Sequence, residues 1–233
     1  MTVPSEPQSQ DVAAFFDVDG TIVEATVVHY YAYLATYGYS DIRRTTWTAA
    51  FLPKVAYYLL LDMTNRSRFN RVFYHNYRGM DVAQIRDRSD DHFEHFIRPR
   101  MFSGAIERIA EHRTRGERVV LITGSLDFIM EPVSAFLKTD GLIAVKMHEK
   151  DGRLTGALTG PPIGDEEKAK VMRAYAEEHH INLAKSYGYA DSSSDLPMLH
   201  SVGHATVVNP GRKLRRIAKE QDWEIKEWTP SSI

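Results

Sequence analysis

An unbroken apolar run that ends in two aspartates constrains this chain most. Residues 12–16 are apolar at every position, which is typical of a parallel strand buried on both faces. Asp17 and Asp19 follow the run, and Gly20 marks the turn where the strand ends. Side chains two residues apart in extended backbone lie on the same side. Because two carboxylates so close repel each other, the position indicates a divalent cation, an acid–base role, or both.

Composition limits the classes of protein that the chain can belong to. Its 233 residues predict one large domain or one core with an inserted unit. The net charge of -2 gives no support to a nucleic-acid partner, and the lack of cysteine excludes disulfides and thiolate nucleophiles. Residues 1–10 are polar and predict a short disordered lead-in without a signal pattern, which favours a cytoplasmic protein. The longest apolar passage, residues 49–61, is too short for stable insertion into a membrane.

From residue 103 onward, predicted helices and strands alternate regularly. Such alternation favours a parallel α/β sheet with right-handed crossovers. Asp151 and Gly152 in addition predict the turn of a hairpin that continues into residues 154–158. The predicted strands after the first are residues 119–123, 142–147, 186–190, 204–208 and, at an edge, 224–228, and the predicted helices are residues 103–116, 126–137 and 165–179.

The segment between the first two predicted strands is different, because residues 26–100 contain helical patterns only. We therefore expect a core formed by residues 11–24 and 100–233, with an all-helical cap of residues 25–99 inserted between the first and second core strands. In open α/β sheets ligands bind beyond the carboxyl ends of the strands. Three of these ends carry polar or glycine residues, namely Asp17 with Asp19, Thr123 with Gly124, and Asp191.

Two further features complete a set of motifs. Asp195 follows Asp191 by four residues and is predicted to begin the next helix. Lys168 falls in the first turn of the helix that begins at Asp165. Together, Asp-x-Asp-Gly-Thr, the strand-ending Thr-Gly, the helical lysine and Asp-x-x-x-Asp resemble the haloacid dehalogenase superfamily of phosphotransfer enzymes. All four superfamily motifs occur in order. The position of the cap resembles subfamily IB, which is phosphoserine-phosphatase-like and has a Rossmann-like core.

The resemblance implies a Mg²⁺-dependent phosphomonoester hydrolase and a role for each acidic residue. Asp17 would be the nucleophile that forms an aspartyl-phosphate, and Asp19 the general acid and then the general base. Mg²⁺ would be held by the Asp17 and Asp191 carboxylates and the backbone carbonyl of Asp19. Asp195 would act through water or orient the other ligands.

The resemblance also implies how the phosphoryl group is bound. Its oxygens would be held by the Thr123 hydroxyl, the amides of Gly20 and Gly124, and Lys168. Lys170 is a competing lysine on the same helix. Lys168 is preferred because it directly follows Gly164-Asp-Glu-Glu, as in the subgroup that the chain resembles.

The cap is expected to select the substrate, a small-molecule phosphate ester. Phosphoserine phosphatases have a glutamate nine residues after the nucleophile, where this chain has Thr26, so phosphoserine is not the expected substrate. The cap is instead rich in Tyr, Trp, Phe and Leu. These side chains either fill a helical core or line an apolar channel for a lipid-like or aromatic ester, with weak contact between the cap and a membrane surface.

Two alternatives stay open on the same motifs. A phosphotransferase would pass the phosphoryl group to an alcohol instead of water. A non-catalytic module would bind phosphate esters without turnover, although binding alone needs no pair such as Asp17 and Asp19. The sequence does not decide the oligomeric state.

Overall fold

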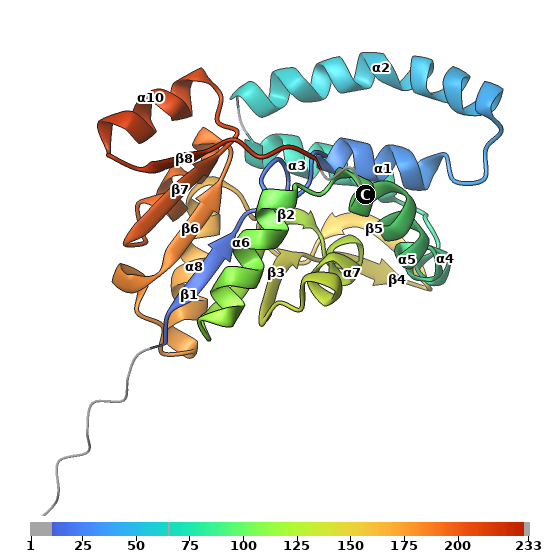
Figure 1. The fold of residues 1–233 in the computed structure, drawn as a ribbon. Coiled ribbons are helices and arrows are strands. Elements are labelled where there is room, and N and C mark those ends of the chain that lie inside the picture. Colours follow the sequence, from blue (N-terminus) through green and yellow to red (C-terminus); the bar gives the residue numbers. More distant parts are fainter. Residues whose placement is uncertain (1–10, 65, 231–233) are drawn as a thin grey trace, which may run out of the picture.

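The computed structural model describes residues 11–64 and 66–230 and has a six-stranded parallel sheet at its centre (Figure 1). The strand order is β3-β2-β1-β6-β7-β8, which confirms the predicted α/β class. A separate two-stranded sheet pairs β4 with β5. The strands are β1 (Ala13–Phe16), β2 (Arg118–Leu126), β3 (Gly141–Val145), β4 (Met147–Lys150), β5 (Arg153–Leu158), β6 (Tyr187–Ala190), β7 (His204–Val208) and β8 (Glu224–Lys226).

The helices fall into a cap group and a core group. The cap helices are α1 (Val27–Ala35), α2 (Asp41–Thr64), α3 (Arg66–Tyr74), α4 (Val82–Asp87) and α5 (Ser89–His92), followed by a π-helical turn (Phe93–Ile97). The core helices are α6 (Ser103–Thr114), α7 (Asp127–Leu137), α8 (Asp165–Glu178), α9 (Leu196–Leu199) and α10 (Arg212–Glu220). No helix in the described ranges is long and apolar enough to cross a membrane.

Strand β1 lies between β2 and β6 and is buried on both faces. The ring of Phe15 meets Tyr175 of α8 edge to face at 6.4 Å, whereas the ring of Phe16 meets His112 of α6 at 6.0 Å. Successive side chains of a strand point to opposite faces, so α8 and α6 cover opposite faces of the sheet. This double cover explains the unbroken apolar run and places Asp17 at the carboxyl end of a central strand.

The cap is dominated by α2, which runs without a break through Pro53 and lies across α1 and α3 (Figure 1). Its inner face buries Phe51 and Tyr58 in an aromatic cluster that includes Tyr31 of α1. Its outer face exposes Leu52 and Leu60. The inner-face side chains therefore fill a helical core, which is the first of the two expectations, while the apolar channel and the contact with a membrane surface stay predictions.

The prediction of a single strand over residues 142–147 was wrong, because this segment is divided between two strands. Strand β3 ends at Val145, and from Met147 the chain forms β4 of the β4–β5 hairpin, with its turn at Asp151 and Gly152 as predicted. The chain departs from the main sheet because the hairpin bonds to the cap: the Gly79 amide donates to the Leu154 carbonyl at 2.8 Å, and the Leu154 amide donates to the Met80 carbonyl at 2.9 Å.

Two boundaries next to the expected site also differ from the predictions. Strand β2 continues past Thr123 to Leu126, so α7 begins at Asp127. Asp195, predicted to begin the next helix, lies in a 3₁₀ turn (Ser193–Asp195), and α9 starts one residue later. Ser192 caps this turn by accepting a hydrogen bond from the Ser194 amide, which explains why the α-helix starts late.

Buried His92 in the cap predicts a loss of stability in acid. Burial lowers the pKa of His92 to about 4, although Asp91 raises it, while an unfolded histidine titrates near 6.5. Folding therefore favours the neutral ring. The contribution of His92 to stability is fully present above pH 6.5 and is lost as the pH falls toward 4. This residue alone should lower the free energy of unfolding by about 2 kcal/mol between pH 7 and pH 5.

Urea unfolding at the two pH values measures this loss. His92→Phe keeps an aromatic ring against Tyr33 and should lack this part of the pH dependence. His148→Gln, at an exposed histidine, is the control and should keep it. Equal pH dependence in His92→Phe and the wild type would contradict the assignment.

Candidate active site

Asp17 is held in place by contacts from three parts of the fold. Its amide donates to the Tyr189 carbonyl of β6 at 2.9 Å. One carboxylate oxygen, Oδ1, accepts from Lys168 Nζ at 2.6 Å, and the other accepts from the Thr21 hydroxyl at 3.1 Å. Burial raises the pKa of Asp17 to about 8, and Lys168 opposes that rise. Positive charge is therefore needed to keep this carboxylate ionised and nucleophilic at neutral pH.

Lys168 supplies part of that charge. Its Nζ lies 2.6 Å from Asp17 and 2.7 Å from Asp195, and its side chain is buried. Although burial lowers it, the two carboxylates raise the pKa of Lys168 above its usual value, so the ammonium stays charged. Lys170 is exposed and pairs with Glu167 on the surface. The structure thus brings Lys168, and not Lys170, into the site.

A group of three carboxylates forms a candidate metal centre. Asp17, Asp191 and Asp195 each offer an oxygen, and these oxygens lie within 4.8 Å of one another. An all-oxygen donor set of this size, with room for water, suits Mg²⁺. Three of the four predicted ligands therefore come together through their side chains, while Asp19 was expected to contribute only its backbone carbonyl.

Gly20 makes the close approach of Asp191 possible. Its φ of +90° lies in a region that disfavours side chains, and a Cβ built on it would lie 2.2 Å from Asp191 Oδ2. Its amide donates to the Val23 carbonyl at 2.8 Å, so in this conformation it faces backbone and not the expected phosphoryl group. The phosphate-binding role of Gly20 stays a prediction.

Asp19 is not part of this group of three carboxylates, and its side chain is held by two hydroxyls. Thr123 Oγ1 donates to Asp19 Oδ2 at 2.8 Å, and Ser125 Oγ lies within 3.0 Å of both carboxylate oxygens. Burial raises the pKa of Asp19, while the two hydroxyl donors lower it. A raised pKa favours the protonated form of the carboxyl group, which a general acid needs. Thr123 thus contacts Asp19 in this structure, and its phosphate-binding role stays a prediction.

Sequence reasoning missed several residues around the site. Ser125 had no visible signal, because its position depends on the register shift of β2 between Ile122 and Leu126. Tyr74 of α3 donates its hydroxyl to the Gly124 carbonyl and so connects the cap to the core. Asn70, also on α3, is buried and lines the site. Only the packing of α3 over the sheet reveals these last two.

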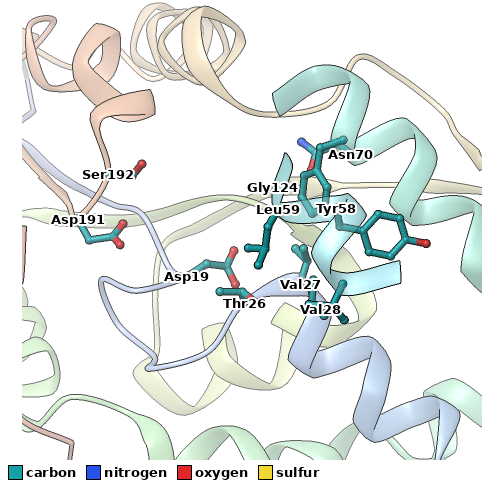
Figure 2. A pocket seen from close by; sticks show the side chains of 12 residues that line it. Asp19, Thr26, Val27, Val28, Tyr58, Leu59, Asn70, Gly124, Asp191 and Ser192 are labelled. Carbon is teal, nitrogen blue, oxygen red and sulfur yellow. The ribbon is translucent and has the colours of Figure 1, made fainter. Parts of the chain in front are cut away.

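A cavity of about 180 Å³ connects the carboxylates to the cap. Asp19, Asp191, Ser192 and Gly124 form its core side (Figure 2). The cap contributes apolar side chains and two neutral polar ones, and none of the described residues on this wall is charged. The cap wall consists of Thr26, Val27, Val28, Val55, Tyr58, Leu59, Phe69 and Asn70.

Comparison with known proteins identifies the family. The family model of haloacid dehalogenase-like hydrolases matches residues 14–200. The chain belongs to this family. A probable phosphatase of Mycobacterium tuberculosis is 32% identical over 91% of this chain and 74% of its own length. Phosphoserine phosphatase SerB1 of the same organism is 30% identical over 95% of this chain and 72% of its own length. The predicted family and its phosphatase-type hydrolase class are thus confirmed.

Solved structures confirm the family fold. A protein of unknown function from Bordetella pertussis superposes with a TM-score of 0.79 at 21% identity and covers 94% of this chain and 99% of its own. A phosphoserine phosphatase in a phospho-aspartyl intermediate analogue has a TM-score of 0.70 at 20% identity and covers 96% of both chains. Both likenesses extend over more than nine-tenths of this chain and concern its fold alone.

Proposed function

We propose that this hydrolase removes phosphate from monoesters whose leaving group is uncharged and mainly apolar, through an aspartyl-phosphate on Asp17. The cavity carries the proposal, because its core side presents the carboxylates and its described cap wall has no charged side chain. A charged leaving group would lose water against the cap wall without gaining an ionic partner among its described residues, which is strongly unfavourable. Val27, Leu59 and Phe69 instead offer apolar surface.

The chain's own groups balance the two chemical steps. In the first, an Asp17 oxygen attacks phosphorus, the ester P–O bond breaks, and Asp19 gives its proton to the departing alkoxide. In the second, a water attacks phosphorus, Asp19 takes the proton from that water, and the bond between Asp17 and phosphorus breaks. The raised pKa of Asp19 supports its role as the general acid in the first step. The hydrogen bond from Lys168 to Asp17 supports the orientation of the nucleophile toward phosphorus.

A divalent cation fits this scheme. Asp17, Asp191 and Asp195 would hold Mg²⁺ with the Asp19 carbonyl. When bound, Mg²⁺ supplies positive charge that offsets the repulsion between these carboxylates and an anionic substrate. Lys168 and the hydroxyl donors would fix the orientation of the phosphoryl group.

Removal of the metal should silence the enzyme reversibly. EDTA is expected to abolish phosphate release, because four carboxylates would then repel the anionic substrate. Among the described residues, Lys168 is the buried cation that lies next to these carboxylates, and it offsets only part of their charge. Adding Mg²⁺ in excess should restore the full rate. Phosphate release that persists in EDTA after dialysis would contradict a metal requirement.

A panel of phosphate esters tests the substrate class. Hexyl phosphate and phenyl phosphate should have a kcat/KM at least about 100-fold above that of phosphoserine, whose charged leaving group has no ionic partner among the described residues of the cap wall. Histidinol phosphate belongs in the panel, because a histidinol-phosphatase of Neisseria meningitidis is 25% identical over 91% of this chain. Equal rates for apolar and charged esters would overturn the proposed specificity. Phosphate and alcohol released in equal amounts, also with an added alcohol, would exclude phosphotransfer.

Two expectations about location stay predictions. Helix α2 exposes Ile42, Leu52 and Leu60, which is the kind of surface that weak contact with a lipid bilayer needs. Sedimentation with phosphatidylcholine vesicles would measure that contact. Cell fractionation would test the cytoplasmic location.

A further inference from the structure

The hydroxyl of Tyr30 is a buried donor without a formed hydrogen bond to the described residues. Tyr30 lies on α1, the first helix of the cap, and its side chain is fully buried. Among the described residues its hydroxyl forms no hydrogen bond. A buried hydroxyl left unpaired costs stability, so its presence calls for a reason.

Asp19 is the neighbouring group that could accept a hydrogen bond from the Tyr30 hydroxyl. Burial and then the adjacent Asp19 carboxylate raise the pKa of Tyr30 well above its usual range, so the hydroxyl keeps its proton. Tyr30 in turn lowers the pKa of Asp19, so the hydroxyl and the carboxyl group are near enough to interact, although they lack the geometry of a formed hydrogen bond. Edge-to-face contacts with His92 at 5.8 Å and Phe96 at 6.4 Å fix the position of the Tyr30 ring. A small movement of Asp19 would therefore be enough to complete the bond.

Thr123 explains why Asp19 would need a second donor. A hydroxyl has one hydrogen to donate. Thr123 donates it to Asp19 and accepts a hydrogen bond from the Ser125 amide at 2.9 Å. If Thr123 binds a phosphoryl oxygen during the reaction, it must release Asp19. Of the two hydroxyls that hold the Asp19 carboxyl group in this structure, only that of Ser125 would then remain.

We propose that Tyr30 is a positioning residue for Asp19 and replaces Thr123 as its hydrogen-bond donor when Thr123 turns to the phosphoryl group. This inference rests on the proposed function. The exchange keeps two donors on Asp19 and aims it at the leaving-group oxygen while the substrate is bound. The cap thereby contributes to proton transfer, in addition to shaping the leaving-group cavity.

Tyr30→Phe, which removes only the hydroxyl, tests the exchange with two esters. Hexyl phosphate releases a basic alkoxide that needs a proton from Asp19, whereas 4-nitrophenyl phosphate releases a stable anion that does not. The ratio kcat/KM reports the steps through departure of the leaving group. We expect this ratio to fall about 10- to 100-fold for hexyl phosphate and less than about 3-fold for 4-nitrophenyl phosphate. The melting temperature should stay equal or rise, because the resting protein loses no hydrogen bond.

Tyr33→Phe is the matched control. Tyr33 lies on the same helix and packs on the same His92 ring, but its hydroxyl donates to Asp91 at 2.9 Å. Its two kcat/KM values should equal those of the wild type. A parallel fall for both esters in Tyr30→Phe, no fall for either, or a lower melting temperature would overturn the positioning role. If wild-type enzyme hydrolyses neither ester, the proposed function fails and this inference fails with it.

Discussion

Asp17→Asn should lower kcat by about 10⁴-fold or more while the protein stays folded. The amide keeps the shape of the side chain and can still accept from Lys168, but it is a poor nucleophile and cannot form an aspartyl-phosphate. Because burial raises the pKa of Asp17 to about 8, replacing its charge by a neutral amide should not weaken the fold. Phosphate release from hexyl phosphate and the melting temperature measure the two effects.

A direct search for the intermediate makes this experiment sharper. Wild-type enzyme mixed with substrate and quenched in acid should gain the mass of one phosphoryl group on the peptide that contains Asp17, and Asp17→Asn should not. Asp151→Asn, in the exposed turn of the hairpin, is the control and should behave as wild type. An Asp17→Asn enzyme that keeps more than about a tenth of the activity would contradict the nucleophile assignment.

Lys168→Met should destabilise the metal-free protein by about 3–5 kcal/mol, the usual cost of removing one partner from a buried ionic group. Asp17 and Asp195 would be left without the ammonium that now lies 2.6 and 2.7 Å from them. Mg²⁺ should restore part of the loss, since a cation bound by the carboxylates would replace some of the missing charge. Urea unfolding in EDTA and in Mg²⁺ measures both effects.

The same variant should lose activity even with Mg²⁺ present. Removing one fixed donor to a developing anion typically costs about 10²- to 10³-fold in kcat. Lys170→Met is the matched control, because Lys170 lies two residues further on, is exposed and should change neither stability nor rate. Wild-type stability of Lys168→Met in EDTA would mean that the three-residue ionic group contributes nothing to folding.

The sequence contained enough information for the core of the site because that core follows from strand order. Asp17 and Asp191 directly follow β1 and β6, Thr123 lies in the last part of β2, and these adjacent parallel strands bring the three positions together. Lys168 was predictable because a motif fixes its place in the first turn of a helix. These positions depend on local pattern and on a simple topological rule.

The remainder of the site depends on packing that no local pattern encodes. Ser125 reaches Asp19 only because β2 shifts its register after Ile122. Tyr30, Asn70 and Tyr74 look like ordinary cap residues until α1 and α3 are laid over the sheet. Their neighbours lie far away in the chain, as in the bond from Tyr74 to Gly124.

The β4–β5 hairpin changes what could be moved as one unit between enzymes of this fold. Its backbone hydrogen bonds to Gly79 and Met80 join segments that lie far apart in the sequence, and a graft of residues 25–99 alone would break them. The resulting chimera would expose unpaired amides and carbonyls on both sides of the cut. A transplant that changes substrate preference should therefore carry residues 147–158 with the helices, because the exchangeable module is discontinuous in sequence.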